Sequence, residues 1–124
     1  MKITSAELSV MEVLWDDAPL AAAEVAARLA PKGWSVTTVK TLLSRLAEKG
    51  AVGTARDGRR YLYTPLTERA AHRRHAVGAL SARLFGGKAA PMVAHLADAK
   101  GLSAQDLDEL EALVQRLRED GETA

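Results

Sequence analysis

Short hydroxyl side chains and basic side chains recur along one stretch of this sequence, and they are the side chains best suited to bind another molecule. Six of them fall largely on one side of a helical pattern: Thr37, Thr38, Lys40, Thr41, Ser44 and Arg45. Hydroxyls and cations hydrogen-bond to phosphate oxygens and to the edges of nucleic-acid bases. Because no carboxylate follows in this stretch before Glu48, we interpret this side as a candidate DNA-binding surface.

A second group of cations lies in the segment that follows. Alternating side chains around the turn dipeptide Asp57-Gly58 predict a β-hairpin over residues 51–65. Three arginines crowd its tip: Arg56, Arg59 and Arg60. We expect Arg59 and Arg60 to contact phosphates or a minor groove. Residues 35–60 hold six Lys/Arg and two Asp/Glu, which favours DNA contact over a merely solvated turn.

Other combinations of reactive side chains are weaker. His72 and His75 could share a helix face as metal ligands, but the arginines between them would repel a cation, and His95 is distant. We favour an ordinary basic helix near the DNA backbone. The sequence has no cysteine, which excludes disulfides, thiolate metal sites and cysteine nucleophiles. It also lacks a glycine-rich phosphate loop and a nucleophile motif, so we expect neither an enzyme nor a cofactor.

One amphipathic helix within residues 34–50 would position the six polar residues. Its apolar positions recur at helical spacing: Val39, Leu42, Leu43 and Leu46. Ser35 is suited to cap the start of this helix, and Gly50 can adopt the left-handed conformation that ends it. We expect the apolar side to pack in a core and the polar side to act as a recognition helix.

Two further helices are predicted before this one. Thr4 and Glu7 form a capping-box pattern at the start of a helix over residues 5–15. An alanine-rich helix over residues 21–30 follows, and Pro31-Lys32-Gly33 ends it. A short helix, a break and a longer helix with exposed hydroxyls and cations form a helix-turn-helix pattern.

Three helices followed by a basic hairpin predict a winged-helix DNA-binding domain over residues 1–66. The expected fold class is therefore mainly α with a small β-hairpin wing. Trp15 and Trp34 could in principle stack on bases, but their apolar spacing favours positions in or beside the core.

Residues 67–124 are predicted to form a helical dimerisation domain. The pattern indicates helices over residues 67–85, 90–98 and 103–120. Helices of this size cannot bury their own apolar stripes, so we expect a second copy of the chain as the partner. Two copies related by a twofold axis would read a dyad operator. The residues expected at the dimer interface are Val77, Leu80, Leu84, Met92, Leu107, Leu110, Leu113, Val114 and Leu117.

Charge is distributed unevenly along the 124 residues, although the net charge is only +1. Residues 1–66 carry +2, residues 67–87 carry +3 and residues 88–124 carry −4. A basic front and an acidic tail fit a DNA-binding part joined to a part with another role. The alternative is a winged helix that binds only protein, with the acidic last helix as its docking surface. No secretory signal and no membrane-spanning run is evident, so we expect a cytoplasmic protein without membrane insertion.

These motifs resemble, in the same order, those of the BlaI/MecI/CopY family of bacterial repressors, the penicillinase-repressor type. The segments that carry the resemblance are ITSAELSVMEVLW, GWSVTTVKTLLSRLAEKG, RDGRRYLYTPL, LFGG and GLSAQDLDELEALV. The resemblance implies a winged helix that binds a dyad operator, a dimerisation domain, and repression of β-lactam-resistance or related operons. It also implies DNA contact by the six helix residues and by Arg59 and Arg60. We further expect phosphate contact near Thr4 and Ser5, from the amides at the start of the first helix.

The sequence departs from the family pattern in two places. β-Lactam-responsive members are inactivated by cleavage at an Asn-Phe bond in the dimerisation region, which a membrane sensor-protease triggers. The corresponding position here is His95-Leu96, so cleavage there is not expected from the residue types. The copper-responsive members carry cysteine ligands, and this chain has no cysteine. The resemblance therefore implies a repressor but leaves the inducing signal open.

Overall fold

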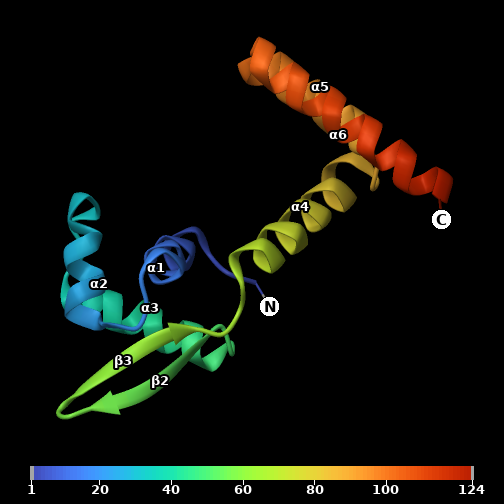
Figure 1. The fold of residues 1–124 in the computed structure, drawn as a ribbon. Helices are drawn as coiled ribbons and strands as arrows, with labels where there is room; N and C mark the ends of the chain where they lie inside the picture. Colours follow the sequence, from blue (N-terminus) through green and yellow to red (C-terminus); the bar gives the residue numbers. More distant parts are fainter. Residues whose placement is uncertain (1, 124) are drawn as a thin grey trace. The chain divides into compact units, whose positions relative to one another are not determined.

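The computed structural model describes residues 2–123 as mainly helical, with one small antiparallel sheet (Figure 1). This arrangement confirms the predicted fold class. The chain divides into two compact units, one ending at His75 and the other beginning at Ala76. The point of division between the two units lies inside one helix. The boundary between domains that the sequence analysis placed after residue 66 stays a prediction.

Three helices form most of the first unit. They are α1 (Ser5–Asp16), α2 (Ala22–Arg28) and α3 (Val36–Glu48). The predicted capping box at Thr4 and Glu7 is present, and Gly50 has the left-handed φ of 78° that was expected after α3. The prediction for the second helix was too long, because a 3-10 turn, η1 (Ala30–Lys32), replaces its end around Pro31.

The core of the first unit lies between these helices. Its members are the apolar residues that recur at helical spacing, among them Val10, Met11, Leu14, Val25, Val39, Leu42, Leu43 and Leu46. Trp15 and Trp34 are partly buried and pack against this cluster, as expected. Burying a side chain such as Leu43 or Leu46 stabilises the fold by about 1.5–3 kcal/mol, so the core fixes which side of α3 faces outward.

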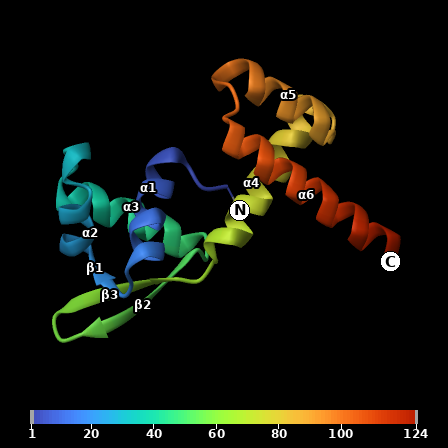
Figure 2. The same cartoon turned by 45° about the horizontal axis from the view of Figure 1, so that its top comes forward.

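The sheet has three strands, one more than the sequence predicted. The hairpin strands β2 (Val52–Asp57) and β3 (Arg60–Pro65) pair as expected, and β1 (Leu20–Ala21) pairs with the other edge of β3 (Figure 2). A strand of two residues is too short to produce an alternating pattern. Its pairing, Leu20 with Tyr63 and Ala21 with Leu62, joins the start of α2 to the wing.

Helices alone form the second unit. α4 (Arg69–Phe85) begins in the first unit and ends in the second, and α5 (Ala89–Lys100) and α6 (Ala104–Thr123) follow. Ser103 and Asp106 form the capping box predicted at the start of α6. No side chain described in these three helices is buried.

Candidate nucleic-acid interface

The local sequence of α3 determines which of its side chains face outward. Ser35 caps the helix, because its hydroxyl accepts the Thr38 N–H at 3.1 Å. The four apolar positions are buried, and the six residues predicted to bind DNA are all exposed: Thr37, Thr38, Lys40, Thr41, Ser44 and Arg45. The structure therefore presents these six together on the solvent side of one helix, as the pattern indicated.

Two of the hydroxyls on this surface already have partners within the helix. The Thr41 hydroxyl donates to the Thr37 carbonyl at 3.1 Å, and the Thr38 hydroxyl lies 3.1 Å from that of Ser35. Thr41 thus keeps its methyl group and its oxygen lone pairs for a ligand, but not its proton. Lys40 and Arg45 make no ion pair among the described residues, so their charges are available to phosphate.

The turn of the wing differs from the predicted one. Asp57 pairs with Arg60, so the central residues are Gly58 and Arg59 rather than Asp57 and Gly58. Among the described residues only glycines have positive φ, and Gly58 has φ 65°. A glycine at the first central position suits a two-residue hairpin turn in which only that position needs positive φ. The change places Arg59 at the tip itself.

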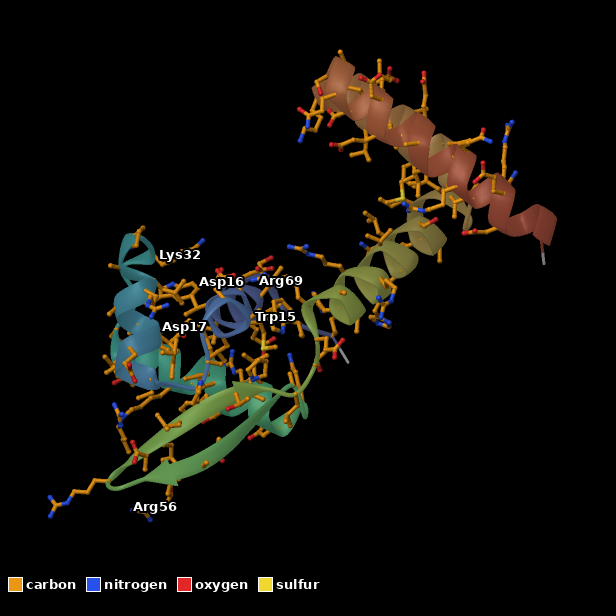
Figure 3. The ribbon with its side chains drawn as sticks, viewed as in Figure 1. Trp15, Asp16, Asp17, Lys32, Arg56 and Arg69 are labelled. Carbon is orange, nitrogen blue, oxygen red and sulfur yellow. The ribbon has the colours of Figure 1, made fainter. Side chains whose placement is uncertain are left out.

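The three wing arginines have different surroundings. Arg59 is exposed and has no ion-pair partner among residues 2–123. Arg60 donates to Asp57 Oδ2 at 3.2 and 3.3 Å and to Glu24 Oε1 at 3.3 Å. The Arg56 guanidinium lies 5.5 Å from the centre of the Tyr61 ring, beside the tip in Figure 3. Of the two arginines predicted to bind DNA, only Arg59 is therefore free of an ion pair among the described residues.

A groove of about 390 Å³ lies between α3, the start of α2 and the wing. Its lining includes Lys40 from α3 and both Arg59 and Arg60 from the wing, with Val36 and Tyr61 as apolar contacts. Sequence analysis placed these cations on separate elements, and the fold brings them to one concave surface. Of the six α3 residues predicted to bind DNA, only Lys40 lines the groove. The other five are exposed on α3 outside it: Thr37, Thr38, Thr41, Ser44 and Arg45.

Glu24 also lines this groove and was missed by the sequence analysis. It is the third residue of α2, where a glutamate often accepts the backbone N–H that precedes a helix. Its Oε1 accepts the Ala21 N–H at 3.0 Å. That helix-start position was the available signal, but only the fold reveals that the same carboxylate reaches Arg60.

Ser5 lies at the opposite end of α3 from the groove. The Lys49 ammonium, just after α3, donates to the Lys2 carbonyl at 2.7 Å and to Glu7 Oε1 at 2.5 Å. These bonds hold the start of α1 beside the end of α3. The whole of α3 is about 20 Å long, so its two ends are far apart. The structure thus does not bring Ser5 together with Lys40 and Arg59. Ser5 is the first residue of α1 and is exposed.

The Glu7 carboxylate in this contact is ionised despite its burial. Burial by itself would raise its pKa, but hydrogen bonds from Lys49 and Thr4 outweigh that effect and lower the pKa below its ordinary value. The Thr4 N–H donates to the same Oε1 at 2.8 Å, whereas Oε2 is buried without a partner among the described residues. This pair serves the fold rather than the DNA site, since the Lys49 ammonium and the Glu7 carboxylate are bonded to each other.

The remaining candidate residues lie outside the groove. Among the described residues no group of three His, Cys, Asp or Glu side chains could hold a metal. His72 instead lies against the Trp15 ring, with the centroids 5.7 Å apart. None of the described helices is long and apolar enough to span a bilayer.

The apolar residues predicted at the dimer interface are not covered. Leu84 is 61% exposed and Leu117 is 57% exposed. The rest are exposed or half-buried: Val77, Leu80, Met92, Leu107, Leu110, Leu113 and Val114. In the second unit, α5 and α6 enclose an open groove of about 430 Å³ that includes Leu96, Leu110 and Leu113.

The candidate cleavage position lies in the interior of α5. His95 and Leu96 are exposed, and the His95 Nδ1 atom is 3.0 Å from the Pro91 carbonyl oxygen of the preceding turn. The His95 ring also lies 5.1 Å from that of Phe85. Cleavage of this bond would require the middle of a helix to unfold.

Comparisons with known proteins agree with this architecture. A family model described as penicillinase repressor matches residues 3–116. A protein from Latilactobacillus sakei, named only by its mass of 16.5 kDa and its position beside ptsI, is 32% identical over 91% of this chain and 78% of its own length. The penicillinase repressor of Bacillus licheniformis is 30% identical over 92% of this chain and 90% of that protein.

A solved structure of a DNA-binding domain matches more than half of the chain. The DNA-binding domain of the repressor BlaI aligns with 37% identity and a TM-score of 0.51, over 56% of this chain and 87% of that domain. The resemblance seen in the sequence is therefore confirmed. Because the family model covers nearly the whole chain, the chain belongs to the penicillinase repressor family of DNA-binding transcriptional repressors, which are not enzymes.

Proposed function

We propose that this chain acts as a homodimer that binds a dyad operator through α3 and the wing and thereby blocks transcription. The observation that carries the proposal is the groove in which Lys40 of α3 and Arg59 of the wing lie together with their charges unpaired. Two unpaired cations on adjoining elements are suited to contact a duplex, one in the major groove and the other on the phosphate backbone beside it.

In this proposal phosphate contacts and base contacts come from different residues. Arg45 and Arg59 would bind phosphates, and Arg60 would add such a contact only when its carboxylate partners release it. Lys40 would reach a base edge in the major groove. Thr37, Thr38 and Ser44 would reach base edges through their hydroxyls. Thr41, whose proton is used within α3, would present its methyl group to a thymine methyl. Ser5 would contact a phosphate at the far end of α3.

Exposure of the second unit supports a homodimer. A unit with no buried side chain among its described residues cannot be stable alone, because apolar burial is what offsets conformational entropy. A second copy of the chain supplies an apolar surface that can cover these residues. A twofold axis between the copies also presents two DNA-binding surfaces to one operator.

The regulated genes and the route of release are proposed from the family alone. We propose β-lactam-resistance or related stress genes as the output, because the Bacillus licheniformis relative is named a penicillinase repressor. Release by a membrane sensor-protease would require α5 to open around His95 and Leu96 before cleavage. We place the repressor in the cytoplasm, where it has access to the DNA.

Selection of bound duplexes from random DNA, followed by salt-dependent affinity measurements, tests the proposal. We expect enrichment of a dyad sequence. Arg59→Ala should weaken binding to every duplex and lower the salt slope by about one, because one phosphate contact is lost. Arg28→Ala, at the far end of α2 and paired with Asp17 at 2.6 Å, is the matched charge control. Lys40→Ala and Thr41→Ala should instead relax the preference for particular bases, and Thr41→Val, which keeps the methyl group, should not.

Two outcomes would contradict this function. If no sequence is enriched while the protein binds other proteins, the winged helix is an interaction module. If Arg59→Ala leaves the salt slope as it is in the Arg28→Ala control, the wing does not belong to the DNA site.

A further inference from the structure

Glu24 is a carboxylate in a groove whose other charged lining residues are the cations Lys40, Arg59 and Arg60. We propose that Glu24 is an electrostatic brake on DNA binding: it withholds Arg60 from phosphate and so weakens affinity for DNA of any sequence. This inference rests on the proposed function, because it assumes that DNA enters the groove of Lys40, Arg59 and Arg60. It assigns to Glu24 a positioning role, since the carboxylate acts through the arginine.

The backbone fixes the position of the Glu24 carboxylate. Its Oε1 accepts the Ala21 N–H at 3.0 Å and an Arg60 N–H at 3.3 Å. Ala21 belongs to β1 and pairs with Leu62 of β3, the strand that also carries Arg60. The same sheet therefore aligns the carboxylate with the guanidinium. A freely rotating surface glutamate would lack this alignment.

Arg60 is also held by a second carboxylate, that of Asp57 at the turn. The Arg60 side chain is 55% exposed and that of Glu24 is 46% exposed, so their pair is weak and easily exchanged. A phosphate oxygen can replace Glu24 on the guanidinium, but the displaced carboxylate then lies in the groove beside the phosphate. Like charges at close range repel, so each such contact gains less than an unopposed arginine would.

Arg59 differs from Arg60 in this respect. Both line the groove, but Arg59 has no ion-pair partner among the described residues. Removing Arg59 should therefore reduce the salt slope by about one, whereas removing Arg60 should reduce it by much less. With the brake in place, the two adjacent arginines would contribute unequally to phosphate binding.

Binding of the full-length protein to a random-sequence duplex, measured by fluorescence anisotropy, tests the brake. Glu24→Gln should raise affinity on the order of fivefold at about 50 mM salt and steepen the salt slope by about one. The gain should therefore shrink roughly threefold by about 200 mM salt. The glutamine oxygen can still accept the Ala21 N–H, so the start of α2 is preserved. Glu48→Gln, which makes the same charge change at an exposed position near the end of α3, is the matched control.

A double-mutant cycle separates action through Arg60 from a general charge effect. Glu24→Gln should give a much smaller gain in affinity when Arg60→Ala is already present, because only the direct repulsion between Glu24 and phosphate is then relieved. Asp57→Asn, which releases the same arginine from its other carboxylate, should raise affinity independently. These two results support the brake even if Glu24→Gln lowers the thermal midpoint.

Three results would overturn the brake. The first is an equal gain in affinity for Glu24→Gln and Glu48→Gln, and the second is a gain for Glu24→Gln that is undiminished when Arg60 is absent. The third is loss of preference for a cytosine in selected sites of Glu24→Gln, which would make the carboxylate a base contact. If the wild-type chain binds no duplex at about 50 mM salt, the proposed function fails instead, and Arg59→Ala then has no effect either.

Discussion

At the level of single residues, the contact between Glu7 and Lys49 shows how two charged groups can serve the fold rather than the site. Glu7 is 1% exposed, and Lys49 and Thr4 together keep its pKa low against the effect of burial. The pair joins the start of α1 to the residue after α3. It therefore helps to hold α3, which presents the proposed DNA-binding surface, against the rest of the core.

The lowered pKa predicts a loss of stability in acid. Because the folded-state pKa lies below the unfolded-state value, the contribution of Glu7 is fully present above about pH 4.3 and is lost as the pH falls through the folded-state pKa. At neutral pH, Glu7→Gln should lower the free energy of unfolding by about 1–3 kcal/mol. Urea denaturation between about pH 3 and pH 7 should show this difference shrinking toward acid.

Glu48→Gln provides the comparison, since Glu48 is exposed and has no ion-pair partner among the described residues. It should change the free energy of unfolding by less than about 0.5 kcal/mol. A difference between wild type and Glu7→Gln that stays constant across the pH range would contradict an ionised Glu7.

At the level of elements, the first turns of α4 are attached to the winged helix (Figure 3). The Trp15 indole N–H donates to the Thr67 carbonyl at 2.7 Å, and Arg69 contacts the Asp16 carboxylate at 2.6 Å. The bond to Asp16 raises the pKa of Arg69. The Arg69 guanidinium and the His72 ring both lie against Trp15. For this reason the first compact unit extends to His75, past the end of the wing.

Loss of the Trp15 hydrogen bond should loosen this attachment without disturbing the core. Trp15→Phe keeps an aromatic ring but removes the N–H, so we expect the free energy of unfolding to fall by about 1 kcal/mol. Hydrogen exchange measured by mass spectrometry should be faster over residues 68–75. Trp34→Phe is the matched control, because Trp34 is also partly buried and its indole makes no hydrogen bond among the described residues. Equal protection of residues 68–75 in the two variants would show that the bond does not hold α4.

At the level of the whole molecule, the two units differ in how they are stabilised. The first has a continuous core built from residues 10–52 and the packing of three helices and a sheet. In the second, every described side chain is at least partly exposed, and large apolar residues such as Leu107 and Leu117 lie half in solvent. Such surfaces are characteristic of association.

The proposed dimer makes a direct prediction for α6. Leu117→Glu should raise the dimer dissociation constant by at least about tenfold, because a charge would be buried at an apolar interface. Sedimentation equilibrium measures this change. Ala112→Glu introduces the same charge on the opposite side of the helix and should leave the dissociation constant nearly unchanged. Leu117 is 57% exposed within one chain, so the substitution removes little that stabilises the monomer. A wild-type chain that sediments as a monomer, or two variants that behave alike, would contradict the proposed interface.

Most of the helical framework and the outward side of α3 could be predicted from the sequence. Helical periodicity is a local property, and the capping groups at Thr4, Ser35 and Ser103 lie within three residues of their partners. Local signals could not indicate β1, whose two residues acquire their conformation by pairing with β3. They also misplaced the central residues of the wing turn by one position, because the register of the whole hairpin decides which residues occupy it.

The sequence by itself determined which residue types are available to bind DNA, since exposure on α3 follows from which positions the core requires. Only the tertiary structure decided which of those charges are free. Glu24 is 36 residues from Arg60, and Glu7 is 42 residues from Lys49, yet each carboxylate reaches its cation. Ion pairs between distant segments depend on how strands and helices pack, and no periodicity within one segment encodes that packing.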